Sequence, residues 1–388
     1  MMKRLLTAML AVMLILLPMA AHASELNLQP KPMPVSEALT FTSGIRLGWN
    51  LGNTFDASEC NWLSNEMQYE SAWCGVKTRE ELFDRLVEAG FNAVRIPVSW
   101  HNHVDEDYTI SPNWLARVKE VVDWAYSRDM YVILNIHHDN STDFFYPNNE
   151  YMEQSLTYVT RIWAQLADAF AEYGERLIFN TLNEPRLVNH PNEWWFNESD
   201  PVCQEAAECI NQLNQAAVDT IRAAGGQNAT RYILCPGYDA SAQGATNKYF
   251  RLPTDPVESN DGHILVSVHA YTPYNFALEG NGKKTWSRKN GPDLNGMTSF
   301  MQTLYNKYIL QGVGVIIDEF GARNREGNTE ARCEFAQSYV AEAKSRGIPA
   351  FWWDNNAFNG GEEFGLINRR TCTWVYPEIV EAMMGELE

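Results

Sequence analysis

The sequence lacks the short motifs that mark several large enzyme classes. No Cys-x-x-Cys pair occurs, so a cysteine-based zinc site is not expected. A Gly-x-Ser-x-Gly elbow and a His-Glu-x-x-His helix motif are both missing, which argues against a serine hydrolase and a zinc protease. The Gly-rich fingerprint of a dinucleotide-binding fold is missing too. A catalytic metal is therefore not expected.

Positive charge is scarce. The 388 residues include 30 Lys and Arg against 49 Asp and Glu, which gives a formal net charge of −19. A uniform excess of negative charge repels phosphate groups, so neither nucleic acid nor a membrane surface is an expected partner. Hydrophobic residues make up 45% of the chain, which is enough for a buried core and excludes both disorder and a small disulfide scaffold.

The N-terminal segment predicts export. Lys3 and Arg4 precede an uncharged run that ends in Ala21-His22-Ala23, which is typical of a secretory signal over residues 1–23. The alternative, a membrane anchor, is disfavoured because Pro18 interrupts the short apolar run. Residues 24–388 are then expected to form one domain, secreted to the periplasm or the medium, with no membrane contact after signal removal.

Seven cysteines in an exported chain permit disulfides and leave one cysteine over. Cys235 ends an apolar run and is the natural buried thiol. The connectivity stays open, and the pairs closest in sequence are Cys60 with Cys74, Cys203 with Cys209, and Cys333 with Cys372.

Short apolar segments alternate with segments of helical periodicity along the whole chain. Eight strands with helices between them favour a single-domain (β/α)₈ barrel of the α/β class over an open sheet. The expected strands are Gly44–Asn50, Phe91–Val98, Met130–His137, Leu177–Asn183, Tyr232–Gly237, His263–His269, Val313–Glu319 and Pro349–Asp354.

The strand-to-helix connections are long, whereas the helix-to-strand joints are short. A bare barrel needs about 250 residues, so the surplus lies mainly at the carboxyl ends of the strands, where such barrels place their active sites. These long loops are expected to form a substrate cleft, and they carry aromatic residues suited to stacking on a ligand: Trp62, Trp73, Tyr146, Trp194, Trp195, Tyr274 and Trp286.

Two glutamates follow apolar strands at positions that face each other. Glu184 ends the fourth expected strand and Glu319 the seventh. Strands four and seven lie across the mouth of an eight-stranded barrel, so the two carboxyl groups can face one substrate. A separation of about 5–5.5 Å would suit glycoside hydrolysis with retention of configuration, and a wider gap would suit inversion.

Other strand ends supply supporting polar and aromatic groups, namely Arg95, His137, His269, Tyr271 and Trp353. His137-His138-Asp139 invites comparison with a metal site. However, neighbouring residues of a strand point to opposite faces, so at most one of the two histidines is expected to face the interior.

The ordered set of strand-end motifs resembles the bacterial cellulases of glycoside hydrolase family 5, a branch that also includes xyloglucanases and lichenases. The resemblance runs from about Gly44 to Trp374. Its motifs are Leu47–Thr54, Val94–Val98, Ile136–Asp139, Leu182–Arg186, Val268–Tyr274 and Ile317–Gly321.

The resemblance implies a retaining endo-β-1,4-glucanase that needs no cofactor and acts on cellulose, mixed-linkage glucan or xyloglucan. It implies Glu319 as the nucleophile, held ionised by Arg95 and aimed by Tyr271. Glu184 would be the acid/base, with its pKa raised by burial and by the neighbouring carboxylate. Asn183 would bind the sugar 2-hydroxyl, His137 and His269 would position the reacting groups, and Trp353 would support the sugar ring.

Substrate preference is less determined by the sequence. Asn53 and Asp56 are candidate sugar contacts beyond the cleavage point, and the candidate stacking platforms are Trp49, Trp100, Trp195 and Trp286. The alternatives that stay open are a xyloglucanase, lichenase or mannanase of the same family, and a polysaccharide-binding protein without turnover.

Overall fold

Eight parallel strands close into a barrel in the part of the chain that the computed structural model describes, residues 26, 28–260 and 262–387. Each strand pairs with the next along the chain, and β8 pairs back with β1. The expected barrel is therefore confirmed, while the expected signal segment lies outside the described residues. The strands are β1 (Gly48–Leu51), β2 (Ala93–Ile96), β3 (Tyr131–Asn135), β4 (Leu177–Asn180), β5 (Ile233–Ser241), β6 (Ile264–His269), β7 (Val315–Phe320) and β8 (Ala350–Asp354).

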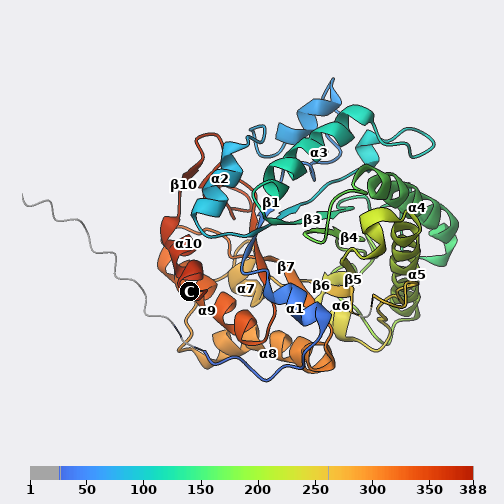
Figure 1. Cartoon of the computed structure of the whole chain (residues 1–388). Helices are drawn as coiled ribbons and strands as arrows, with labels where there is room; N and C mark the ends of the chain where they lie inside the picture. Colours follow the sequence, from blue (N-terminus) through green and yellow to red (C-terminus); the bar gives the residue numbers. More distant parts are fainter. Residues whose placement is uncertain (1–25, 27, 261, 388) are drawn as a thin grey trace, which may run out of the picture.

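Helices surround the barrel on the outside (Figure 1). They are α1 (Glu37–Ser43), α2 (Glu81–Glu88), α3 (Pro112–Tyr126), α4 (Met152–Ala169), α5 (Pro201–Ala223), α6 (Ala242–Thr246), α7 (Tyr274–Ala277), α8 (Gly291–Lys307), α9 (Thr329–Ser345) and α10 (Pro377–Met384). A short antiparallel pair, β9 (Ile367–Asn368) and β10 (Thr373–Trp374), follows β8. Among the described residues, no helix is both long enough and apolar enough to cross a bilayer.

The sequence of α3 illustrates why these helices cover the sheet. The helix begins at Pro112, whose fixed φ suits a first helical position. Its buried residues, Trp114, Val118, Val121, Val122 and Ala125, recur every three or four positions. They therefore form one apolar stripe that packs on the barrel, and the polar residues between them face outward.

Glycine keeps the joints before β2 and β8 short. Gly90 follows α2 with φ +102°, and Gly347 follows α9 with φ +70°. A side chain at either position would be strained in this left-handed region, so glycine lets the chain turn from helix to strand within a few residues.

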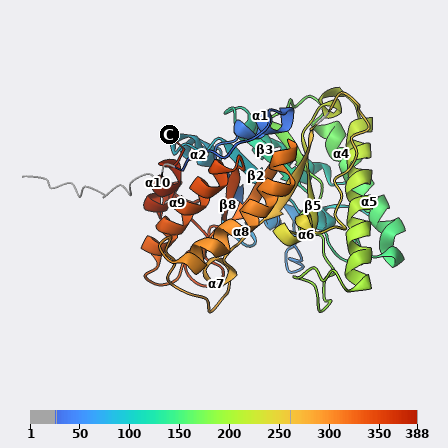
Figure 2. The same cartoon turned by 90° about the horizontal axis from the view of Figure 1, so that it is seen from below.

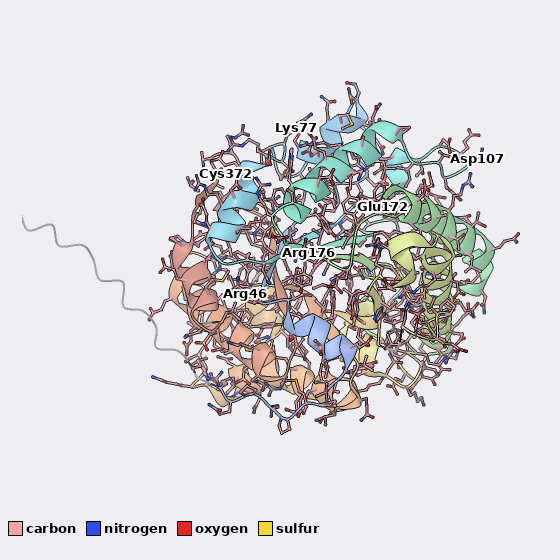
Figure 3. The ribbon with its side chains drawn as sticks, viewed as in Figure 1. Arg46, Lys77, Asp107, Glu172, Arg176 and Cys372 are labelled. Atoms are coloured by element: carbon pink, nitrogen blue, oxygen red, sulfur yellow. The ribbon has the colours of Figure 1, made fainter. Side chains whose placement is uncertain are left out.

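The two ends of the barrel differ in what covers them. Figure 2 shows α1, which precedes β1, at one end and α7, which follows β6, at the other. Figure 3 views the α1 end, where Arg46 and Arg176 lie just before the starts of β1 and β4. The long loops after the strands, and the polar groups that end the strands, therefore lie at the α7 end.

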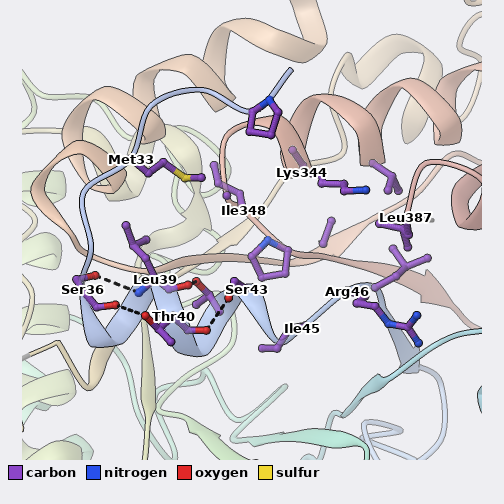
Figure 4. A pocket seen from close by; sticks show the side chains of 18 of the residues that line it. Met33, Ser36, Leu39, Thr40, Ser43, Ile45, Arg46, Lys344, Ile348 and Leu387 are labelled. Atoms are coloured by element: carbon purple, nitrogen blue, oxygen red, sulfur yellow. Dashed lines mark hydrogen bonds between the residues drawn. The ribbon is translucent and has the colours of Figure 1, made fainter. Parts of the chain in front are cut away.

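A cavity of about 520 Å³ opens at the α1 end, between α1, the start of β8 and α9 (Figure 4). Leu39, Ile348 and Leu387 contribute to its mainly apolar lining. None of the predicted site residues lines it. The cavity is thus separate from the strand ends that carry the glutamates.

The candidate disulfides are not formed. All seven cysteines lie in the described part of the chain, and each one is a free thiol. Cys235 is buried in β5 as expected, and burial raises its pKa to about 12. Export permits disulfides without requiring them, so spacing alone was a weak guide to pairing.

Candidate active site

The eight predicted central residues come together at the carboxyl ends of the strands. Four of them lie within β2, β6, β7 and β8, and four follow directly after β3, β4 and β6. In strand order they are Arg95, His137, Asn183, Glu184, His269, Tyr271, Glu319 and Trp353. The closure of the barrel brings together groups that lie as far apart as 258 positions along the chain, from Arg95 to Trp353.

Glu319 is held by two donors. Nη1 of Arg95 lies 2.6 Å from Oε1 of Glu319, and the hydroxyl of Tyr271 donates to Oε2 at 2.8 Å. Burial raises the pKa of this carboxyl group above its usual value, although the charges of His269 and Arg95 act in the opposite direction. Both oxygens are thus oriented by hydrogen bonds that favour the carboxylate form.

Arg95 connects Glu319 on β7 to Asn183, which follows β4. Its Nη2 donates to Oδ1 of Asn183 at 2.6 Å, and its Nε lies 3.4 Å from the Asp318 carboxylate. Because Oδ1 of Asn183 accepts this bond, the amide orientation is fixed and the Nδ2 hydrogens remain as donors. This orientation suits Asn183 as a donor to a sugar hydroxyl.

Glu184 interacts mainly with His269, and Nη1 of Arg186 lies 3.8 Å from its Oε2. Nδ1 of His269 lies 2.8 Å from Oε1 of Glu184. Burial favours a neutral Glu184, but the hydrogen bond and charge of His269 lower its pKa to about 2. The expected rise in the pKa of Glu184 is therefore wrong for the free protein, because the charge of His269 outweighs the effect of burial on this carboxylate.

Glu184 and Glu319 face each other at short range. A carboxylate oxygen of each and a ring nitrogen of His269 all lie within 4.8 Å of one another. Retaining glycoside hydrolases place their two carboxyl groups about 5–5.5 Å apart, whereas inverting enzymes need about 6.5–9.5 Å to admit a water. An oxygen–oxygen distance of at most 4.8 Å between these two glutamates is compatible with the narrower class.

Trp353 and His137 form parallel faces on one side of the site. Their rings are 6.0 Å apart and inclined by only 3°. Gly52 lies against the indole ring of Trp353, since a Cβ at Gly52 would come within 2.6 Å of that ring. Close backbone approach at Gly52 fixes the position of the indole.

His137, His138 and Asp56 also bring nitrogen and oxygen atoms within 4.8 Å of one another. His137 is buried while His138 is exposed, which agrees with the expectation that at most one of the two histidines faces the interior. Metal binding at this cluster is disfavoured. Nδ1 of His137 accepts from Nδ2 of Asn135 at 3.0 Å, since Oδ1 of that amide already accepts from Val98. Nε2 of a neutral His137 therefore carries the hydrogen and is a donor rather than a ligand.

Asp318 is a site residue that sequence reasoning missed. It is fully buried, accepts from Ser267 at 2.8 Å, and lies 3.5 Å from Nε2 of His269. The pairing of β6 with β7 skips it, because His269 pairs with Glu319 and Val268 with Ile317. This bulge lets Asp318 and Glu319 both approach Arg95, which regular alternation does not allow.

Comparison with known proteins identifies the family. The model of the cellulase family, glycosyl hydrolase family 5, matches residues 54–359. The chain belongs to this family. It is therefore a glycoside hydrolase, and the predicted resemblance is confirmed.

Curated relatives of this hydrolase include the cellulase/esterase CelE of Acetivibrio thermocellus, with 39% identity over 93% of this chain. The chain spans only 42% of the length of CelE. Endoglucanase A of Clostridium longisporum is 36% identical over 93% of this chain, which spans 69% of that protein.

Among solved structures, a family 5 lichenase from a Caldicellulosiruptor species is 47% identical, with a TM-score of 0.92 and coverage of 94% of this chain and 99% of that one. A xyloglucan-specific endo-β-1,4-glucanase from a metagenomic library, solved with cellotriose, is 37% identical, with a TM-score of 0.80 and coverage of 89% and 98%.

The outer residues of this family 5 hydrolase correct several expectations. Trp49 and Trp100 are fully buried and Trp286 is 3% exposed, so these three rings belong to the core and are not stacking platforms. Trp195 is 65% exposed and remains a candidate platform. The exposed loop aromatics are Trp62, Trp73, Trp194, Trp195 and Tyr274.

Asp56 and Asn53 form a tight loop after β1. Asp56 is fully buried, and its two oxygens accept from the backbone N–H groups of Asn53 and Thr54 at 2.8 and 2.6 Å. A fully buried Asp56 does not fit the expected sugar contact. Its carboxylate instead stabilises the loop through these two hydrogen bonds. Asn53, with φ +57°, is partly exposed, and its side-chain amide makes no hydrogen bond within the described part of the chain.

His101 and His103 have a His-x-His spacing, which is a spacing that metal sites can use. His103 stacks on Trp114 with the ring centres 3.7 Å apart, and burial lowers its pKa to about 3. Nε2 of His101 lies 2.9 Å from Glu59. The two rings thus have different neighbours, and packing explains the pair.

Proposed function

We propose that the protein is an endo-β-1,4-glucanase that hydrolyses internal bonds of β-glucans with retention of configuration. One observation carries this proposal: carboxylate oxygens of Glu184 and Glu319 lie within 4.8 Å of one another. Such a short distance suits direct attack by one of the two groups better than attack by a water, which needs a wider gap between the carboxyl groups.

In the first step, an oxygen of Glu319 attacks the anomeric carbon and forms a glycosyl ester. The glycosidic C–O bond breaks, and its electron pair goes to the leaving oxygen, which takes a proton from Glu184. In the second step, Glu184 removes a proton from water, the water oxygen attacks the same carbon, and the ester bond to Glu319 breaks.

The proton that Glu184 needs is held by His269, whose higher pKa makes the transfer uphill in the free protein. The two groups share one proton, which resides on Nδ1 in the free protein because the pKa of His269 is raised to about 10. Transfer of this proton over the 2.8 Å contact leaves a neutral imidazole and a neutral Glu184 beside the glycosidic oxygen. His269 is thus proposed to position and load the acid.

The β-glucan substrate is supported by the relatives. One structural neighbour was solved with cellotriose as a xyloglucan-specific glucanase, and the Caldicellulosiruptor lichenase was solved as a variant with cellotetraose. Lichenase or xyloglucanase as the main activity is the second candidate, favoured by these same two relatives. Mannanase activity and binding without turnover stay as outcomes of the test.

The test is reducing-end release by purified residues 24–388 without added metal. The substrates are barley β-glucan, carboxymethylcellulose, xyloglucan, glucomannan and xylan, and Glu319→Gln is the matched control. Activity on the first two that disappears in the variant is the expected result. Nuclear magnetic resonance of the first anomer released reports retention or inversion. Tight binding with no release from any polymer would overturn the proposal.

Export is proposed from the charged start and apolar run of residues 1–23. Expression of the full chain in a bacterial host, followed by N-terminal sequencing of the protein outside the cytoplasm, is expected to give a first residue of Ser24. An intact Met1 on the soluble protein would contradict this.

A further inference from the structure

The end of β5 contains a turn that is costly for its residue types. Asp239 and Ala240 are consecutive non-glycine residues in the left-handed region, with φ of +56° and +45°. The pairing of β5 with β6 shifts register between Pro236 and Ser241, which places both residues in a bulge. Such backbone strain gathers at binding and catalytic sites, where the surrounding structure maintains it.

The bulge is fixed next to the acid/base. The backbone N–H of Asp239 donates to the carbonyl of Pro185, the residue that follows Glu184, at 2.9 Å. Gly244 packs directly against it, because a Cβ there would come within 1.9 Å of the Tyr238 carbonyl oxygen. The position of the Asp239 side chain is therefore tied to the segment that carries Glu184.

The Asp239 carboxyl group has no partner among the described residues. Its Oδ1 is buried without a hydrogen bond, and Oδ2 makes none within the described part of the chain, although the residue is partly exposed. The charged groups that act on it are Glu184, Arg186, His269 and Glu193. Burial and the charge of Glu184 raise its pKa well above the ordinary value. A neutral carboxyl group has both a donor and an acceptor to offer.

We propose that Asp239 binds a hydroxyl group of the sugar on the leaving-group side of the scissile bond. This inference rests on the proposed function and names a specificity-determining residue for it. Unpaired polar groups in a cleft are satisfied by ligand or water, and a sugar hydroxyl can pair with both roles of a neutral carboxyl group.

The neighbours of Asp239 indicate that its carboxyl group faces the sugar on the leaving-group side. Glu184 protonates the leaving oxygen, so groups clustered around it in β5 and in the loop after β4 face the departing sugar. Nη1 of Arg186 donates to the Glu184 carbonyl at 3.0 Å, and its guanidinium lies 3.9 Å from the ring centre of Trp194. Trp194 is 61% exposed and offers a flat face on the same side.

The experiment compares two substrates that differ in the leaving group. Cellopentaose places sugars on both sides of the cleaved bond, whereas 2,4-dinitrophenyl β-cellobioside carries no sugar on the leaving side. Asp239→Gly removes the carboxyl group and tolerates positive φ, and Asp239→Asn keeps a donor and an acceptor. Ala240→Gly changes the same strained turn without touching the carboxyl group and is the matched control.

Asp239→Gly is expected to lower kcat/KM on cellopentaose about tenfold, as for one lost hydrogen bond, and to change it less than about twofold on the aryl substrate. Asp239→Asn and Ala240→Gly are expected to stay within about threefold of wild type on both substrates. Equal losses on both substrates, or no loss on either, would overturn the inference. A wild-type protein that cleaves neither substrate would instead defeat the proposed function.

Discussion

Nδ1 of His269 lies 2.8 Å from Oε1 of Glu184, and the same imidazole faces the carboxylates of Asp318 and Glu319. Burial alone would lower the pKa of His269, but the carboxylates of Glu319 and Asp318 and the contact with Glu184 raise it to about 10. The free site therefore contains an imidazolium among carboxylates. Both acid, which protonates Glu184, and alkali, which deprotonates His269, are expected to weaken this contact.

The stabilisation from this pair is expected to have a defined pH window. The pKa of His269 rises from 6.5 to about 10, so its contribution is complete below pH 6.5 and disappears as the pH rises through 10. The pKa of Glu184 falls from 4.5 to about 2, so its contribution is complete above pH 4.5 and disappears as the pH falls through 2. The difference in Tm between wild type and His269→Gln should be largest between pH 4.5 and 6.5. A difference that is constant up to pH 10 would contradict the assigned charge.

Tyr271→Phe is expected to weaken the nucleophile with little effect on the fold. The variant deletes the hydroxyl that donates to Oε2 of Glu319 and leaves the ring in place. Because this hydrogen bond lowers the pKa of Glu319, its loss should move the acidic limb of kcat/KM to higher pH. We expect kcat to fall about 10–100-fold while Tm changes little. An unchanged pH profile would show that Tyr271 does not act on Glu319.

Substitution of two loop tryptophans is expected to have different effects, one on stability and the other on substrate binding. Trp286 is 3% exposed and packs edge-on against Phe335, so Trp286→Ala should cost about 3–5 kcal/mol in the free energy of unfolding. Trp195 is 65% exposed, so Trp195→Ala should cost less than about 1 kcal/mol and raise KM for the polymer. Chemical denaturation and polymer kinetics on the two variants test this. A core-like loss of stability in Trp195→Ala would contradict the exposed position.

Reductant is expected to leave the stability unchanged. All seven cysteines are free thiols, so dithiothreitol has no disulfide to break and Tm should be the same with and without it. Titration of the denatured protein with a thiol reagent should give seven equivalents. Fewer equivalents, together with a fall in Tm under reduction, would show that a disulfide forms.

Two local features of the site could not be predicted from sequence patterns. Asp318 and Glu319 both approach Arg95 because a bulge interrupts the pairing of β6 and β7. Asp239 lies in a second irregularity, between β5 and β6. Strand periodicity assumes regular pairing, and it assigns neighbouring residues to opposite faces. A bulge depends on how the partner strands meet, which a linear pattern does not contain.

Sequence patterns also could not predict which aromatic rings are buried. Trp49 and Trp195 look alike as candidate platforms, yet one is fully buried and the other is 65% exposed. Loop length and aromatic content indicate that rings lie near the mouth of the barrel, but the packing of each loop on its neighbours decides which ring faces solvent.

The sequence by itself determined the barrel, the order of its strands and the pair of glutamates at their ends. Local apolar segments, helix periodicity and glycine joints are properties of short stretches, so they can be recognised without knowing what they contact. The tertiary structure decided the charges within the site, because the pKa of Glu184 depends on a histidine 85 positions away. It also brought oxygens of Glu184 and Glu319 within 4.8 Å of each other, since only closure of the barrel places strands four and seven within reach of one substrate.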